Sequence, residues 1–363
     1  ASAGPSPTPA GTVGPTPSGS LLPPPPSALP SPTGTPSVLP GLAWTALPLP
    51  VDASFTTAGV IDIAVLDGLF VAVGAGWQED ARGVQVNVPL FWLSRDGRAW
   101  EVALDAGWSG GYIDAVTTWQ GQFLAAGYVG DERASAAFWT SADGRSWQRL
   151  TDQPVLEFFR GATEGRDIVA GGISEVRSEA DELIARGWLY CACERGVRDA
   201  IVEWRTTDGE EWRRADLPPD EDAPTPITAG DALLRVAPDR GSIERSTDGT
   251  SWQTAWQPAA GVDGGAAPAA QLFRLGPMAG GFLAVGALLD EESTRPLAVS
   301  SADGLAWGVA AGESVDGVDG ALVAFAAGGG PIVAVGRAGD PAQPYAWLAF
   351  PQSAVEVAIL KGQ

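Results

Sequence analysis

Short apolar runs that end in glycine recur along most of the chain, separated by polar segments. The runs are Leu69–Gly74, Phe123–Gly127, Ile168–Gly171, Phe282–Gly286 and Ile332–Gly336. A variable polar loop and a second apolar segment, such as Pro89–Leu93, come next. Short apolar runs bounded by polar turn residues are typical of buried β-strands. The pattern therefore predicts an all-β protein in which pairs of strands repeat.

A seven-residue turn motif occurs in five places after such strands. It reads Ser/Thr-x-Asp-Gly-x-x-Trp, and its copies begin at Ser94, Ser141, Thr206, Ser246 and Ser301. The aspartate can accept backbone N–H groups just downstream, the glycine tolerates positive φ, and Asp-Gly favours a hairpin. The tryptophan begins the returning strand and offers an apolar face for packing between sheets. We therefore expect structural roles for Asp96, Gly97, Trp100, Asp143, Gly144, Trp147, Asp208, Gly209, Trp212, Asp248, Gly249, Trp252, Asp303, Gly304 and Trp307.

The copies recur at intervals of 40 to 65 residues. Four-stranded units at such periods indicate a β-propeller. The motif resembles the Asp-box, or BNR, repeat of the sialidase-like propellers, and the resemblance covers roughly residues 41–363. We predict a six-bladed, all-β propeller with four-stranded antiparallel blades. The resemblance does not fix an activity, because that family includes hydrolases, receptors and assembly factors.

The segment at the start of the predicted propeller repeats four residues of the fifth turn motif. Gly41-Leu42-Ala43-Trp44 matches Gly304-Leu305-Ala306-Trp307, and Leu47 continues the strand. Propellers close by letting one terminus complete the blade that the other began. We expect the strand with Leu42, Trp44 and Leu47 to join three strands near 320–327, 331–336 and 345–350. Two alternatives stay open: Val355–Leu360 could fill the same place, or strand 42–48 could pair with another molecule and build a filament.

The remaining blades are expected at about 59–105, 111–151, 156–216, 226–257 and 270–311. The fourth is the shortest and has Leu233–Val236 in place of the apolar-glycine run. Blade three is predicted to carry an insertion at about 174–198, with a short helix capped by Ser178. The insertion contains both cysteines, Cys191 and Cys193. A local disulfide, a buried reduced pair and a bridge between chains remain alternatives.

Residues 1–40 differ in kind from residues 41–363. They hold 13 of the 30 prolines, mixed with serine, threonine and glycine. Proline lacks an amide hydrogen and fixes φ near polyproline II, so the segment is predicted to be an extended arm rather than part of a core. It is either a stalk, with serine and threonine open to glycosylation, or an arm that orders against a partner such as a second copy of the chain.

Charge narrows the choice of partners and chemistry. The chain has 44 acidic against 22 basic residues, a net charge of −22, and no histidine. Nucleic acids and anionic membranes need basic clusters, and the lack of histidine excludes histidine-dependent triads and histidine-ligated metals. No apolar run is long enough for a spanning helix. We expect no cofactor, no metal and no membrane insertion, and a secreted or cell-surface location, because the chain starts without Met.

The resemblance also defines what an active sialidase would require: an arginine cluster, a tyrosine nucleophile with a glutamate, and an aspartate acid. Phe273-Arg274 resembles the family's Phe-Arg element, but it precedes the fifth turn motif instead of the first. Arg160 is a second candidate, and none of the four tyrosines has a recognisable glutamate partner.

We therefore interpret the chain as a non-catalytic structural or interaction protein that associates with itself through the arm or a terminal strand, or binds surface glycans. The alternative is a carbohydrate-binding or glycosidase propeller. It would line one mouth of the channel with arginine, carboxylates and exposed tryptophan. The tryptophans outside the repeat positions are Trp77, Trp108, Trp119, Trp188 and Trp256.

Overall fold

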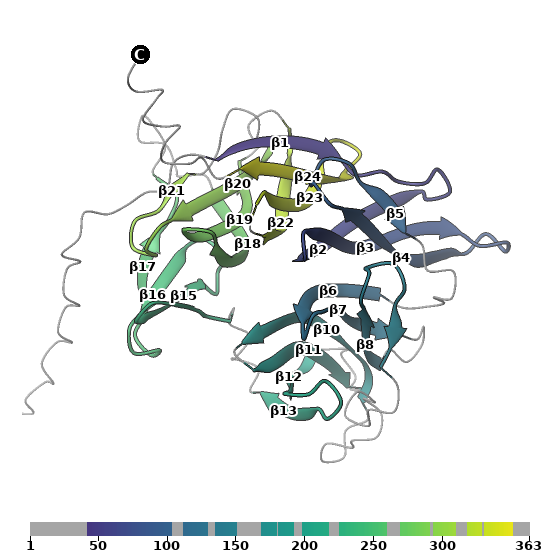
Figure 1. The fold of residues 1–363 in the computed structure, drawn as a ribbon, viewed down its shortest axis with the longest axis horizontal. Coiled ribbons are helices and arrows are strands. Elements are labelled where there is room, and N and C mark those ends of the chain that lie inside the picture. The colour runs from purple at the N-terminus through teal and green to yellow at the C-terminus, as the bar shows by residue number, and fades with distance from the viewer. Residues whose placement is uncertain are drawn as a thin grey trace, which may run out of the picture. The chain divides into compact units, whose positions relative to one another are not determined.

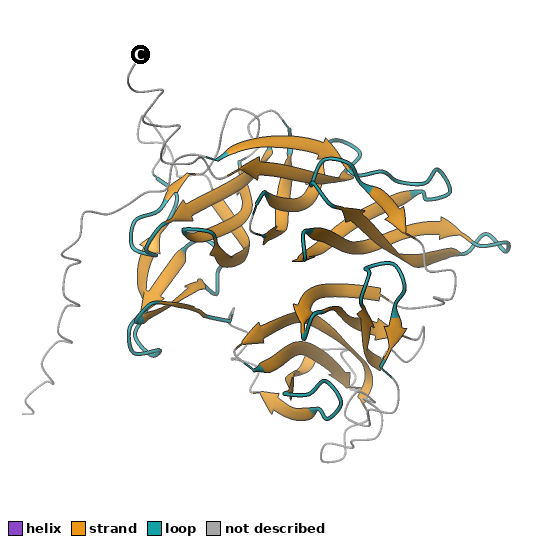
Figure 2. Cartoon of the chain, viewed as in Figure 1, coloured by secondary structure: helices purple, strands orange, loops and turns teal. Residues whose placement is uncertain are grey.

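The computed structural model describes residues 42–350, except 104–111, 130–134, 151–167, 180, 192–197, 218–224, 260–268, 291–292, 310–317 and 329. The described residues form six four-stranded antiparallel sheets, each one blade of a propeller, and contain no helix (Figures 1 and 2). The predicted fold class is confirmed. The arm at 1–40 and the segment Val355–Leu360 lie outside the described residues.

Each blade runs from an innermost strand at the channel to a short outer strand. Blade one contains β2 (Thr57–Leu66), β3 (Leu69–Glu79), β4 (Gln85–Ser94) and β5 (Glu101–Ala103). Blade two contains β6 (Tyr112–Trp119), β7 (Gln122–Val129), β8 (Ser135–Ser141) and β9 (Gln148–Arg149). Blade three contains β10 (Ile168–Glu179), β11 (Glu182–Cys191), β12 (Arg198–Thr206) and β13 (Arg213–Leu217).

Blades four to six continue in the same order. Blade four contains β14 (Ile227–Ala229), β15 (Ala232–Val236), β16 (Ile243–Ser246) and β17 (Gln253–Trp256). Blade five contains β18 (Ala269–Met278), β19 (Gly281–Leu289), β20 (Thr294–Ser301) and β21 (Gly308–Val309). Blade six contains β22 (Gly320–Ala327), β23 (Ile332–Ala338), β24 (Gln343–Phe350) and, as its outer strand, β1 (Ala43–Pro48).

The ring closes within one chain, as the repeated Gly-Leu-Ala-Trp sequence predicts. Strand β1 pairs antiparallel with β24, from Ala43 opposite Phe350 to Pro48 opposite Tyr345. Trp44 is 1% exposed and packs with Leu42 in the apolar cluster between blades five and six. The first strand of the propeller is thus held by its last blade.

The glycine that ends each apolar run is explained by a close approach of two backbones. In blade one, Gly74 on β3 pairs with Val60, and the register then shifts so that β2 carries one extra residue before Asp62. A Cβ on Gly74 would lie 2.0 Å from the carbonyl oxygen of Gly59, which no side chain can tolerate. The same arrangement of glycine and β-bulge recurs at Gly127, Gly187, Gly286 and Gly336. Blade four, in which β14 and β15 pair without a shift, has no such glycine.

The predicted insertion and helix in blade three are wrong. Residues 174–179 and 182–191 belong to strands, because β10 and β11 form a hairpin in which Glu179 pairs with Glu182. The run Ile168–Gly171 lies at the start of the innermost strand, and the glycine that faces the bulge is Gly187 on β11. Cys191 ends β11 and Cys193 lies outside the described residues, so the alternatives for their pairing stay open.

The Asp-Gly turns have the predicted hydrogen bonds. In blade two, Ser141 Oγ donates to Asp143 Oδ1 at 3.1 Å and accepts the Gly144 N–H at 2.9 Å. The N–H groups of Arg145 and Ser146 both donate to Asp143 Oδ1 at 2.9 Å. The hydrogen bonds from Ser146 and Arg145 hold the pKa of Asp143 below its usual value. The other four copies form the same network around Asp96, Asp208, Asp248 and Asp303.

The turns also attach each blade to the one before it. Gly144 has φ of +72°, and a Cβ there would lie 2.6 Å from Val71 of blade one. Trp147 stacks on Phe91 of blade one with ring centroids 4.9 Å apart. Gly97 contacts Val333 and Leu348 of blade six. Gly209 contacts Trp119 of blade two, and Gly304 contacts Leu234 of blade four.

Blade four is the exception to this attachment. Gly249 has Leu233 of its own blade as nearest neighbour, 3.6 Å from a built Cβ. The Trp252 ring lies under the Arg235 guanidinium of its own blade, 3.9 Å from the ring centroid. The turn of blade four therefore does not make the contact with the preceding blade that the other four turns make.

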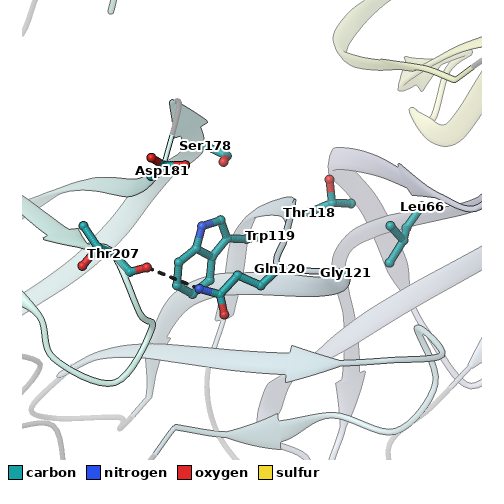
Figure 3. A pocket seen from close by; sticks show the side chains of 8 residues that line it. All are labelled: Leu66, Thr118, Trp119, Gln120, Gly121, Ser178, Asp181 and Thr207. Carbon is teal, nitrogen blue, oxygen red and sulfur yellow. Dashed lines mark hydrogen bonds between the residues drawn. The ribbon is translucent and has the colours of Figure 1, made fainter.

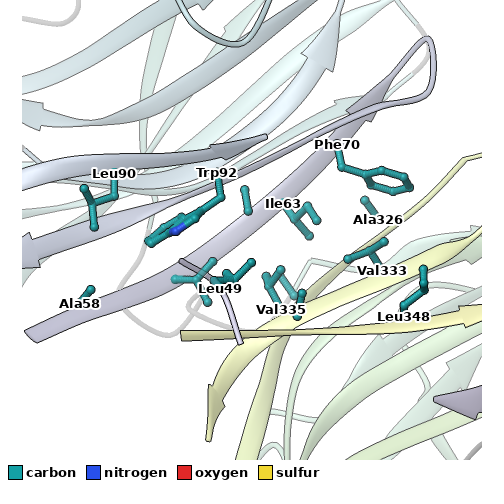
Figure 4. Close-up of a cluster of buried hydrophobic side chains, with 14 residues drawn as sticks. Leu49, Ala58, Ile63, Phe70, Leu90, Trp92, Ala326, Val333, Val335 and Leu348 are labelled. Atoms are coloured by element: carbon teal, nitrogen blue, oxygen red, sulfur yellow. The ribbon is translucent and has the colours of Figure 1, made fainter. Parts of the chain in front are cut away.

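The apolar clusters between blades also distinguish blade four from the others. Each cluster joins two neighbouring blades: six with one (Figure 4), one with two, two with three, four with five, and five with six. In the described part of the chain, no such cluster joins β10–β13 of blade three with β14–β17 of blade four. We call this junction the seam.

Two glycine substitutions separate turn strain from contact between blades. Gly249→Ala should destabilise the protein by about 1 kcal/mol, because alanine disfavours positive φ. Gly144→Ala adds a clash with Val71 and should cost about 2–4 kcal/mol. Urea denaturation of both variants measures the difference, and equal losses would contradict the proposed contact between blades.

Candidate functional site

Charged side chains from three innermost strands converge in the channel. Asp62, Glu175 and Arg274 occupy the same position on β2, β10 and β18, the first paired residue after the bulge. Arg274 of blade five donates from Nη2 to Asp62 Oδ1 of blade one at 2.7 Å. The bulges thus bring an acid–arginine pair from separate blades together.

The Asp62 carboxylate is fully engaged in the fold. Its residue is 3% exposed. Oδ1 also accepts the Ile63 N–H at 2.9 Å, and Oδ2 accepts the Val116 N–H of blade two at 3.0 Å. The charge of Asp62, with a smaller contribution from Glu175, raises the pKa of the partly buried Arg274, although desolvation opposes this shift. One carboxylate therefore links blades one, two and five and fixes the arginine.

Two cavities lie around this pair. The channel cavity, of about 360 Å³, is lined by Asp62, Arg177, Ser178 and Arg274 among others. The seam cavity, of about 610 Å³, has walls from blades three, four and five, with Val323 of blade six, and Arg177, Ser178 and Arg274 line it too. Its charged lining residues are Glu175, Arg177, Arg186, Arg240 and Arg274. Four arginines around one cavity are a local concentration of positive charge in a chain with a net charge of −22.

Carboxylates balance much of this charge. Glu203 of β12 is buried, and its two oxygens accept Arg186 Nε at 2.9 Å and Arg205 Nε at 2.6 Å. Although burial opposes the shift, these hydrogen bonds hold the pKa of Glu203 below its usual value. Arg177 Nη1 lies 3.6 Å from Glu175. The cavity therefore presents oriented donors and acceptors, as ligands with many hydroxyl groups require.

A second acid lies at the junction of blades two and three. Asp114 is the extra residue of the β6 bulge, and burial raises its pKa to about 6. Tyr112 and Tyr128 stack beside it with centroids 4.6 Å apart, and Trp188 meets Tyr128 edge-on at 6.0 Å. Burial first, then Tyr112 and Asp114, raise the pKa of Tyr128. A carboxyl group with a pKa near neutrality is typical of general acids.

The sequence indicated only part of this arrangement. Arg274 lies in the site, whereas Arg160 falls outside the described residues. Tyr345 packs against Trp347 in blade six, at 5.7 Å between centroids, and lines neither cavity. Asp62 and Glu175 were not among the sequence candidates. The signal for Asp62 is its place in a strand whose partner carries the apolar-glycine run Leu69–Gly74, whereas Glu175 has no such signal because the run of blade three lies on its own strand.

The candidate tryptophans are dispersed over the blades. Trp77 on β3 is 36% exposed, whereas Trp119, Trp188 and Trp256 are half-buried. Trp108 lies outside the described residues. No group of three or more histidine, cysteine, aspartate or glutamate side chains that could hold a metal occurs in the described ranges. None of the described elements is a helix that could cross a membrane.

Comparisons with known proteins support the fold. No protein-family model matches the sequence, and no curated protein sequence matches it. Among solved structures, Trypanosoma rangeli sialidase in complex with sialic acid matches with a TM-score of 0.55 and 11% identity. The match covers 89% of this chain and 61% of that chain. This chain has the six-bladed propeller fold of the sialidases.

A phage phi92 endosialidase matches with a TM-score of 0.50 and 11% identity, over 86% of this chain and 70% of that chain. These two neighbours contradict the expectation that the chain is not an enzyme, because both are sialidases that share its fold, although at 11% identity the likeness shows the fold and no activity. The expectation rested on the position of the Phe-Arg element and on the lack of a tyrosine with a glutamate partner, which are features of one family.

The Asp62–Arg274 pair should be energetically coupled. Arg274→Ala leaves a buried carboxylate without its cation and should destabilise the protein by about 2–4 kcal/mol. The double variant Asp62→Ala/Arg274→Ala should be more stable than the sum of the single losses predicts, by about 1–3 kcal/mol. Urea denaturation of all four proteins measures this coupling.

The pair Asp231 and Arg245 in blade four is the control, because Asp231 is 92% exposed. The same set of single and double variants at Asp231 and Arg245 should give a coupling free energy below about 1 kcal/mol. Additive losses at Asp62 and Arg274 would show that the channel pair does not link the blades energetically.

The pKa of Asp114 predicts a distinct pH dependence. Its folded value of about 6 lies above the ordinary 3.8, so its contribution to stability is present below about pH 4 and is lost as pH rises through about 6. Asn is neutral throughout, so Asp114→Asn should be more stable than wild type by about 3 kcal/mol at pH 7. The difference in stability between this variant and wild type, measured from melting curves, should vanish toward pH 4.

The matched control is Asp143→Asn, because the pKa of Asp143 is lowered instead. Stability from Asp143 is present above about pH 4 and is lost as pH falls further. This variant should not be more stable than wild type at pH 7. A pH-independent effect of Asp114→Asn would contradict the raised pKa.

Proposed function

We propose that the propeller binds a carbohydrate in the seam cavity and that glycoside hydrolysis is the reaction it can support. The observation that carries the proposal is the convergence of Arg274, Glu175 and Arg177 on one cavity, with Arg274 held by Asp62. The fold shared with sialidases adds support at the level of architecture alone.

The geometry assigns different tasks to these residues. Arg274 is fixed by a short hydrogen bond to Asp62, so the ordering of its side chain is already accomplished before a ligand binds. Glu175 is partly exposed and can accept hydrogen bonds from hydroxyl groups. A volume of about 610 Å³ is within the range of small-molecule sites and has room for more than one sugar ring. Asp62 positions the arginine and is too engaged to contact a ligand.

Hydrolysis of a glycoside generally requires a carboxylic acid and a second carboxylate. Glu175 supplies a carboxylate inside the seam cavity. Asp114 of β6, whose pKa is raised to about 6, lines neither the seam cavity nor the channel cavity, so no contact of this group with the ligand is proposed. Secretion, and self-association through residues 1–40, stay predictions beside this proposal.

A glycan array and a panel of fluorogenic glycosides test the proposal. Wild type should bind or turn over at least one saccharide, and Glu175→Gln and Arg177→Gln should reduce this by about tenfold or more. The control is Asp231→Asn, an exposed carboxylate of blade four outside the cavity, which should behave as wild type. Binding without turnover would assign a lectin-like role. The absence of both, or equal loss in the control, would overturn the proposal.

A further inference from the structure

A third cavity lies where the Asp-Gly turn of blade three meets the inner hairpin turns of blades two and three. It has a volume of about 510 Å³ (Figure 3). Its lining residues are Leu66, Thr118, Trp119, Gln120, Gly121, Ser178, Asp181 and Thr207. We call it the turn cavity. None of the arginines of the seam cavity lines it.

The indole of Trp119 is fixed as one wall of this cavity. A Cβ on Gly209, in the turn of blade three, would lie 2.4 Å from the Trp119 ring, so that turn sits directly against the ring. Gln120 Nε2 donates to the Thr207 carbonyl oxygen at 3.3 Å and ties the two turns together. Trp119 is half-buried and packs against the core between blades two and three. Ligand binding therefore need not order the Trp119 side chain, so little conformational entropy is lost there.

Polar groups surround the ring. Figure 3 shows Asp181 and Ser178 together near the indole, with Thr118 on another side. Asp181 and Ser178 are exposed and lie at the turn between β10 and β11. The described lining contains a carboxylate, hydroxyl groups and an aromatic ring, and no lysine or arginine.

This combination matches the two surfaces of a pyranose ring. The apolar C–H face of a sugar can pack on an indole, whereas adjacent hydroxyl groups donate to a carboxylate in strong, charge-assisted hydrogen bonds. An acidic sugar would place its charge beside Asp181 without a cation to balance it. We propose that the turn cavity is a second carbohydrate site, selective for neutral pyranosides, with Trp119 as the platform and Asp181 as the hydroxyl acceptor.

The test uses methyl α-glucopyranoside, methyl β-galactopyranoside, methyl α-mannopyranoside and galacturonate as probes, with saturation-transfer NMR on the full chain. At least one neutral glycoside should bind at millimolar concentration, and galacturonate should bind more weakly at this cavity. Asp181→Asn should weaken the neutral glycoside by about tenfold. Ser178→Ala should weaken it less, and both residues are exposed, so these variants should fold.

Two control variants lie outside both cavities. Asp231→Asn, an exposed carboxylate of blade four, and Trp77→Phe, an exposed tryptophan of blade one, should leave the affinity for the neutral glycoside unchanged. Trp119→Phe should retain part of the binding. The proposal fails if no neutral probe binds, if Asp181→Asn binds as wild type, or if either control variant loses the binding. Loss of binding at the seam cavity alone would leave the turn cavity intact.

Discussion

The close approach of a backbone carbonyl of the innermost strand to the second strand is the constraint on which the rest of this propeller depends. Only glycine leaves room for that oxygen, which is 2.0 Å from a built Cβ at Gly74. The approach accompanies a bulge, and the bulge changes which side chains of the inner strand face the channel. Asp62, Glu175 and Arg274 owe their convergence to this arrangement. The glycine that allows the bulge therefore lies on the second strand of the blade, whereas the charged residues of the site lie on the innermost strand.

Much of the architecture is visible in the sequence because its signals are local. The Asp-Gly turns require residues that neighbour one another in the chain, and the copy of Gly304–Trp307 at Gly41–Trp44 marks the closing strand. Blade three was misread because Ile168–Gly171 on an inner strand has the same composition as the glycine-ended run of a second strand. Ser178 and Asp181 have the spacing of a helix cap, but they border a hairpin turn between two long strands.

The candidate site could be predicted only in part, because its residues are brought together by the closure of the ring. Arg274 was noticeable from its Phe-Arg sequence, yet its partner Asp62 is 212 residues away. Nothing local marks Glu175 as a channel residue, since its position depends on the register shift opposite Gly187. The absence of one family's tyrosine pattern could not decide the activity, because one fold can carry many different functions.

The seam is the junction at which the described residues lack an apolar core between blades. Five junctions are filled by apolar clusters, and packed cores resist small displacements. Where the other junctions hold apolar side chains, the junction of blades three and four holds the seam cavity with its arginines and its carboxylate. The space that a sixth cluster would fill is therefore open to a polar ligand.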